Sequence, residues 1–153
     1  MSGLDRFLDA QDAPYAGYDA ALAEMKQGRK RSHWIWYVFP QLAGLGQSEA
    51  ARTYGIDGRR EAVAYIHHPV LRERLIEIAT AVEDQLDRGV DLAVLMGSEI
   101  DARKLVSSMT LFRGVAERVD AELADVAGNI LDQAAAQGYA ACEFTLRELA
   151  RSR

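Results

Sequence analysis

The seven residues His33–Phe39 (HWIWYVF) limit the fold of this chain more than any other segment. Their aromatic and β-branched side chains are typical of a β-strand, but apolar residues on either side recur at helical spacing. Because the stretch is apolar on every side, it must be largely buried in either form. A single buried strand without a partner would leave its backbone polar groups unpaired. We therefore predict a short helix, with Ser32 as its N-cap and Pro40 after its end.

The rest of the chain contains apolar residues at helical spacing, separated by glycine, proline and capping residues. Ser98 and Asp101 have the spacing of a capping box, which predicts a helix start. Besides HWIWYVF, the predicted helices cover 4–11, 15–27, 48–54, 59–66, 69–87, 91–96, 98–112, 120–136 and 143–150. No repeat or linker divides the 153 residues. The sequence thus predicts an all-α fold, a single compact domain of short and medium helices spanning 1–153.

Composition excludes several classes of protein. Apolar residues make up 49% and charged residues 27%, as in ordinary globular domains. The net charge of −5 disfavours a general nucleic-acid binder. A single cysteine, Cys142, cannot form an internal disulfide, which suits a reducing compartment. The chain has neither a signal-peptide pattern at its start nor an apolar run long enough for a membrane helix. We expect a cytoplasmic protein without membrane contact, of unknown oligomeric state.

The segment GRKRSHWIWYVFPQLAGLGQS, residues 28–48, combines basic and aromatic side chains. Arg29, Lys30 and Arg31 precede the predicted helix start, where free backbone N–H groups favour an anion. Indole rings such as that of Trp36 can stack on a base or a sugar. These residues together could hold a nucleotide-like molecule. The alternative is that the cations complement the end of the preceding helix and that the aromatic residues are core.

A second segment, DARKLVSSMTLF over residues 101–112, places polar residues beside an apolar stripe. On a helix, Asp101, Lys104 and Ser108 lie along one margin of the stripe formed by Leu105, Met109 and Phe112. A carboxylate, an ammonium group and a hydroxyl on one edge can bind a polar ligand or move a proton. The alternative is a capping aspartate that pairs with Lys104 at the surface.

Other motifs carry less chemistry. GLGQS, residues 44–48, matches neither a P-loop nor a dinucleotide fingerprint, and is better explained as a turn ending at a capping serine. His67 and His68 are adjacent and would point about 100° apart on a helix, which disfavours metal binding. Nothing in the sequence marks Cys142 as a nucleophile. We predict no metal site and no cofactor.

Three strings together strongly resemble domain-of-unknown-function family 1810, a group of small, mainly bacterial proteins. They are the segment of residues 28–48, EAVAYIHHPVLRERLIE over 61–77 and DARKLVSSMTLF over 101–112, with a weaker match in CEFTLREL over 142–149. The resemblance covers about residues 4–150 and implies a mainly helical fold, but no established function. Ile35 stands where the family usually has methionine, and Ala102 where it commonly has a second acidic residue. The second departure weakens any mechanism that needs paired carboxylates.

The order of a basic–aromatic segment and an HPxL-type helix start is also loosely similar to NADAR-type proteins, which remove ADP-ribose from modified nucleobases. We expect this chain to bind an anionic, ADP-ribose-like small molecule. Whether the chain is an enzyme stays open; as an enzyme it would hydrolyse an N-glycosidic bond, with His33 or Asp101 handling the proton. The expected ligand contacts are Arg29, Lys30, Ser32, Trp36, Gln41, Lys104 and Ser108. The alternative function is a non-catalytic helical module that binds a partner protein.

Overall fold

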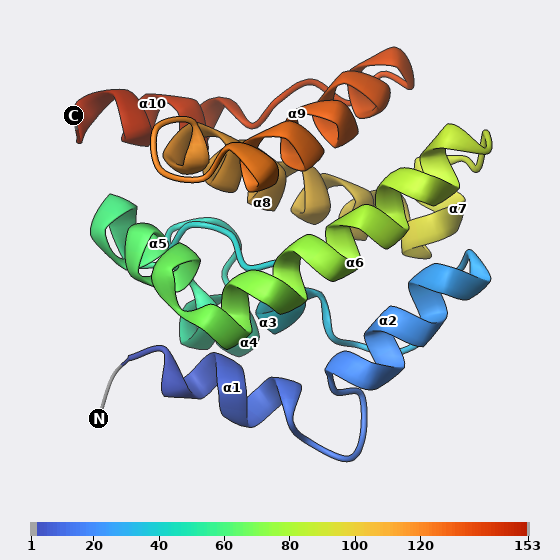
Figure 1. Ribbon diagram of the computed structural model, residues 1–153, viewed down its shortest axis with the longest axis horizontal. Coiled ribbons are helices and arrows are strands. Elements are labelled where there is room, and N and C mark those ends of the chain that lie inside the picture. The colour runs from blue at the N-terminus through green and yellow to red at the C-terminus, as the bar shows by residue number, and fades with distance from the viewer. Residues whose placement is uncertain (1–2, 153) are drawn as a thin grey trace.

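The computed structural model describes residues 3–152, and these residues form ten helices and no strand (Figure 1). The predicted all-α fold is confirmed, as a single compact helical domain. The helices are α1 (Asp5–Gln11), α2 (Tyr18–Gln27), α3 (Ile35–Val38), α4 (Glu49–Tyr54), α5 (Gly58–His67), α6 (Pro69–Asp87), α7 (Leu92–Met96), α8 (Glu99–Ala116), α9 (Ala121–Ala136) and α10 (Glu143–Arg151).

Local sequence signals explain where most of these helices begin and end. Gly28 adopts the left-handed conformation with φ of 90° and ends α2, as a residue without a side chain does easily. Pro69 occupies the first turn of α6, and Nδ1 of His68 accepts the Leu71 N–H at 3.3 Å. The Ser98 hydroxyl accepts the Asp101 N–H at 3.1 Å and begins α8. The capping spacing in the sequence therefore predicted this helix start correctly.

The HWIWYVF segment is helical, but the helix is shorter than predicted. Helix α3 covers only Ile35–Val38, and Trp34 rather than Ser32 occupies its N-cap position. Ser32 is not a cap because its hydroxyl donates to the Glu24 carboxylate at 2.6 Å. Trp34 and Phe39 are fully buried at either end of the helix. The segment is therefore held in place mainly by burial of its aromatic side chains.

Helix α8 runs through the middle of the molecule and is enclosed by other helices. It packs most extensively against α9 and also contacts α3, α5, α7 and α10. Every residue from Leu105 to Phe112 is buried. Ser108 is consequently fully enclosed, whereas the sequence placed it at the margin of an apolar stripe. The single-stripe expectation fails here because neighbouring helices cover α8 on several sides.

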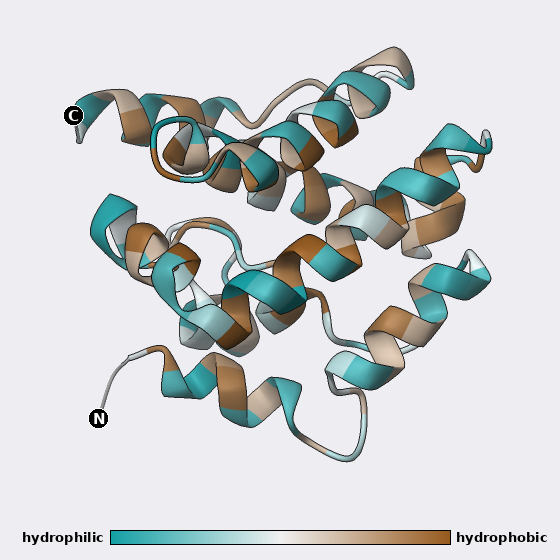
Figure 2. Cartoon of the chain, viewed as in Figure 1, coloured by the Kyte–Doolittle hydropathy of each residue, from teal (hydrophilic) through white to brown (hydrophobic). Residues whose placement is uncertain are grey.

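Helix α6 crosses the front of the molecule in Figure 1 and packs against α2, α5, α7 and α9. Apolar and polar residues alternate along the long helices, as the brown and teal segments of Figure 2 show. The buried apolar residues form one continuous cluster that extends from α1 to α10. Among the described residues, no helix combines the length and apolar character needed to cross a membrane.

Candidate functional site

The basic segment that follows α2 is fastened to the end of α7. The Lys30 N–H donates to the Leu95 carbonyl at 2.7 Å. Gly97, which ends α7 in the left-handed conformation, lies so close that an added Cβ would stand 3.2 Å from the Lys30 carbonyl oxygen. These contacts bring the basic segment to the start of α8. Two stretches some seventy positions apart in the sequence thus meet in space.

Asp101 is the point at which the two stretches meet. Its carboxylate forms an ion pair with Lys30 at 2.9 Å and a longer one with Lys104 at 3.6 Å. The Lys30 side chain is only 5% exposed, and its ammonium group also donates to the Ser32 carbonyl at 2.6 Å. The sequence contains three lysines, and two of them share this one carboxylate. The cluster therefore carries more positive than negative charge.

Both ammonium groups also lie over indole rings. The Lys104 nitrogen is 4.8 Å from the centre of the Trp36 ring, and the Lys30 nitrogen is 5.1 Å from that of Trp34. Such cation–π contacts are favourable by about 0.5–2 kcal/mol, depending on exposure. Trp34 is fully buried, whereas Trp36 is half-buried. A ligand can therefore approach Trp36 and Lys104, while Lys30 and Trp34 form the supporting layer.

Two buried polar atoms lack a hydrogen-bond partner, one in the Trp36 ring and one in a serine four residues after Lys104 on α8. They are Nε1 of Trp36 and Oγ of Ser108, and among the described residues no other side-chain nitrogen or oxygen is buried and unpaired in this way. A buried group left unpaired costs about 1–3 kcal/mol of folding free energy. The Trp36 N–H and the Ser108 hydroxyl can therefore each form a hydrogen bond with a molecule that reaches them.

Glu24 is a residue of this region that the sequence reasoning missed. Its carboxylate accepts hydrogen bonds from the backbone N–H groups of Arg31 and Ser32, from the Ser32 hydroxyl and from the Trp34 indole, at 2.6–2.9 Å. Burial acts to raise the pKa of Glu24, but these hydrogen bonds outweigh burial and lower the pKa to about 2. The backbone donors that we expected to hold a ligand anion at Arg31 and Ser32 are therefore occupied by an internal carboxylate.

A sequence signal for Glu24 did exist. Glu24 follows Ala21 by three positions and precedes Met25, and both of those residues are buried on the inner face of α2. An acidic residue on an apolar helix face needs donors, since a buried unpaired carboxylate is costly.

The remaining predicted site residues lie at different distances from the solvent. Arg29 and His33 are exposed, and the His33 carbonyl accepts the Tyr37 hydroxyl at 3.2 Å. Gln41 is buried and faces the Leu45 carbonyl at 3.5 Å, at the opposite end of α3 from Ser32. The structure therefore gathers Lys30, Asp101, Lys104 and Trp36 at one place. The contact from His33 is made by its backbone carbonyl, and the Gln41 amide faces Leu45, so these two residues lie outside that cluster.

Cys142 has surroundings that the sequence did not reveal. Its thiol lies at the start of α10 and accepts the Thr145 hydroxyl at 3.2 Å. Burial acts to raise the pKa of this thiol, but hydrogen bonds from Ser107, Thr145 and the Phe144 N–H outweigh it, so the pKa is lowered. A cavity of about 240 Å³ adjoins the thiol and is lined by Arg103, Val106, Ser107, Gly138, Tyr139, Ala140 and Cys142.

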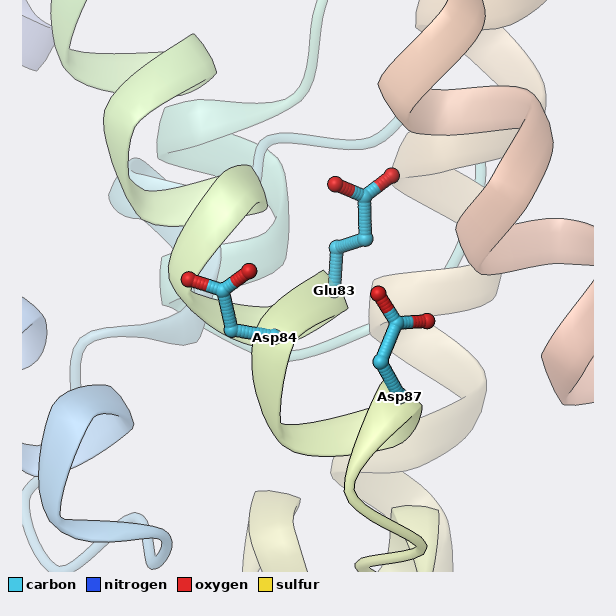
Figure 3. A group of neighbouring side chains, drawn as sticks. All are labelled: Glu83, Asp84 and Asp87. Atoms are coloured by element: carbon cyan, nitrogen blue, oxygen red, sulfur yellow. The ribbon is translucent and has the colours of Figure 1, made fainter.

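An acidic group lies near the end of α6 and has oxygen atoms close enough for one cation (Figure 3). One oxygen each of Glu83, Asp84 and Asp87 lie within 4.8 Å of one another. However, Asn129 donates to Glu83 at 2.8 Å, and Gln133 donates to Asp87 at 2.7 Å. These contacts link α6 to α9, and we assign Glu83 and Asp87 this structural role.

Comparison with known proteins identifies relatives but no activity. A family model described as "Protein of unknown function (DUF1810)" matches residues 1–138. The chain is also similar to the crystal structure of Rv1873, a conserved hypothetical protein from Mycobacterium tuberculosis. The two are 38% identical, the match covers 96% of each chain, and the TM-score is 0.76. A search of curated proteins gave no match.

Proposed function

We propose that this chain, which belongs to the DUF1810 family of proteins of unknown function, binds an anionic, nucleotide-like small molecule beside Trp36 and Lys104. The observation that carries the proposal is the position of the Lys104 ammonium group, 4.8 Å from the Trp36 ring centre, on a side chain that is 25% exposed. A cation next to an aromatic plane matches a molecule that joins an anionic group to a flat heterocycle. Arg29 and Arg31 add exposed positive charge along the same segment.

Asp101 serves this proposal by orienting the two lysines. A carboxylate shared by two ammonium groups fixes their positions and leaves a net positive charge for a ligand. The longer of the two ion pairs is that of Lys104, which is also the more exposed lysine. Lys104 is therefore the cation that we assign to the ligand. The buried Lys30 pairs with the same carboxylate and helps to hold it in place.

Binding of ADP-ribose, NAD, ADP and AMP can be tested by the melting temperature of the protein. A ligand at 100 times its Kd stabilises the folded state by about 2.7 kcal/mol. For a chain of this size, that corresponds to a rise of about 5–10 °C in melting temperature. We expect Lys104→Ala to weaken binding by about 10–100-fold, the effect of losing a charge-assisted hydrogen bond.

The matched control is Lys26→Ala, which removes the remaining lysine at an exposed position on α2. It should leave the ligand-induced shift unchanged. Absence of any shift in the wild-type protein with all four ligands at millimolar concentration would overturn the proposal. An equal loss of binding in both lysine variants would show a general charge effect rather than a site.

Hydrolysis of an N-glycosidic bond is the catalytic extension of the same proposal. Asp101 is the candidate carboxylate, because it pairs with Lys104, whereas His33 is exposed and contacts Tyr37 through its backbone carbonyl. As an enzyme, the protein would release nicotinamide from NAD or a base from a related nucleoside. Asp101→Asn would then abolish release measured by chromatography, while Asp101→Glu would retain part of it. If the wild-type protein leaves NAD and the nucleosides intact, the catalytic extension is wrong and only binding remains.

The alternative, a module that binds a partner protein, has one supporting observation near the same place. Val94 and Ile100 are 54% and 65% exposed on either side of the turn between α7 and α8. Light scattering at high protein concentration, with Ile100→Asp as the comparison, tests the simplest version, which is self-association. A dimer lost in the variant favours the module, and a concentration-independent monomer counts against self-association.

A further inference from the structure

The two unpaired buried atoms, Trp36 Nε1 and Ser108 Oγ, both belong to neighbours of Lys104. The Trp36 ring lies under the Lys104 ammonium group at 4.8 Å. Ser108 is four residues further along α8, on the side of the helix that carries Lys104. One unpaired atom of the described residues thus belongs to the ring under the lysine that the proposed function assigns to the ligand, and the other belongs to a residue one helical turn from that lysine on α8.

The chemistry of these atoms limits what can satisfy them. An indole N–H is a donor only, so its partner must offer an acceptor. A serine hydroxyl can donate or accept, and neither group carries a charge. An uncharged group with carbonyl oxygens, ring nitrogens or hydroxyls fits both atoms. An anionic group instead fits the Lys104 ammonium, which has three donors and no acceptor.

We infer that Trp36 Nε1 and Ser108 Oγ bind the uncharged base or sugar of the ligand, while Lys104 holds its anionic group. This inference rests on the proposed function and divides its site into a neutral part and an anionic part. We place the neutral part where α3, which carries Trp36, packs against α8, which carries Lys104 and Ser108.

Lys104 controls access to the Trp36 side of the neutral part. Both orphaned atoms are covered, so a ligand reaches them only when a side chain moves aside. The Lys104 side chain is 25% exposed and lies across the Trp36 ring, and its contact with Asp101 is the longer of the two ion pairs. Its transfer from the ring to the anionic group of the ligand would uncover the indole.

Ser108→Ala tests the inference, with Ser107→Ala as its matched control. Both serines are buried on α8, but the Ser107 hydroxyl is hydrogen-bonded to the Cys142 thiol whereas the Ser108 hydroxyl has no partner. We expect Ser108→Ala to weaken ADP-ribose binding about three- to tenfold without lowering the melting temperature of the free protein. Ser107→Ala should lower the melting temperature and leave the affinity unchanged.

Adenosine and inorganic phosphate distinguish the neutral part of the site from the anionic part. The affinity of each probe is measured by calorimetry. Ser108→Ala and Trp36→Phe should weaken adenosine and ADP-ribose by similar factors and leave phosphate unaffected. Lys104→Ala should weaken phosphate and ADP-ribose but not adenosine, because it removes the cation and uncovers the ring.

The outcomes distinguish this inference from the proposed function. If none of the nucleotides binds the wild-type protein, the proposed function fails and the inference fails with it. If ADP-ribose binds and its affinity is the same in Ser108→Ala and Trp36→Phe, the inference alone is overturned. A fall in melting temperature in Ser108→Ala as large as that in Ser107→Ala also overturns it, because the Ser108 hydroxyl then has a structural partner.

Discussion

Glu24 illustrates how one buried side chain can organise a whole segment. It lies in the last turn of α2, where a negative charge is unfavourable next to the helix dipole. Four donors from Arg31, Ser32 and Trp34 compensate for this position. The carboxylate thereby turns the chain after Gly28 and fixes the segment that carries Lys30.

Glu24→Gln should therefore reduce stability in a pH-dependent way. The folded pKa of about 2 lies below the ordinary value, so the contribution is present above about pH 4.5 and is lost as the pH falls towards 2. We expect a loss of roughly 2–4 kcal/mol at pH 7 that shrinks steadily in acid. Urea unfolding at pH 7, 4.5 and 3 measures it. Glu73→Gln, at an exposed position on α6, is the control and should change little; a pH-independent difference for Glu24→Gln would contradict the assignment.

Cys142 should react at lower pH than an ordinary cysteine. Its lowered pKa means that the thiolate, which is the reactive form, persists below the usual range. We expect the midpoint of iodoacetamide alkylation, followed by mass spectrometry, to lie below that of the same chain unfolded in urea. Ser107→Ala should move the midpoint upward because it removes a hydrogen bond to sulfur. Identical midpoints in the folded and unfolded chains would refute the prediction.

At the scale of elements, α8 links the core to the candidate site. Its first two turns carry Asp101 and Lys104, and its middle is enclosed from Leu105 to Phe112. Ser107 and Ser108 point to different neighbours because successive residues on a helix differ by about 100°. One helix therefore serves both the Lys104 cluster and the cavity beside Cys142.

The start of α8 depends on Ser98, whose hydroxyl accepts the Asp101 N–H. We expect Ser98→Ala to lower stability by about 1 kcal/mol, the usual effect of losing an N-cap. Ser98→Thr keeps an acceptor and should retain most of that stability. Urea unfolding measures both variants. Equal stability of Ser98→Ala and the wild-type protein would mean that packing alone holds the first turn.

At the scale of the whole molecule, the described helices share one core. The continuous cluster of buried apolar residues includes Leu4 before α1 and Leu149 in α10. A domain whose described helices share one core usually unfolds in a single cooperative transition. The stability effects of distant substitutions should therefore report on the same equilibrium.

We accordingly expect tryptophan fluorescence and far-ultraviolet circular dichroism to give coincident urea transitions. Fluorescence reports on Trp34 and Trp36 around α3, whereas circular dichroism reports on all helices. The control is the Ser98→Ala variant, in which both transitions should shift together. Separated midpoints would show that α3 and its surroundings unfold independently of the long helices.

Helix positions were largely predictable because their signals are local. Gly28, Pro69 and Ser98 act through their own backbone and nearest neighbours, so their effects can be read from sequence spacing. Helix α3 was correctly predicted to be a helix, but the predicted helix was longer than the observed one. Its ends depend on burial of Trp34 and Phe39 against distant residues, which spacing does not encode.

The sequence by itself determined the helical class, most helix boundaries and the two segments that carry the candidate site. Only the tertiary structure decided that Lys30 pairs with Asp101, that Glu24 occupies the backbone donors near Ser32, and that Ser108 is enclosed. The physical reason is the distance along the chain over which each interaction acts. Helix propensity and capping act over a few residues, whereas charge pairing and burial depend on which surfaces meet when α2, α3, α7 and α8 pack together.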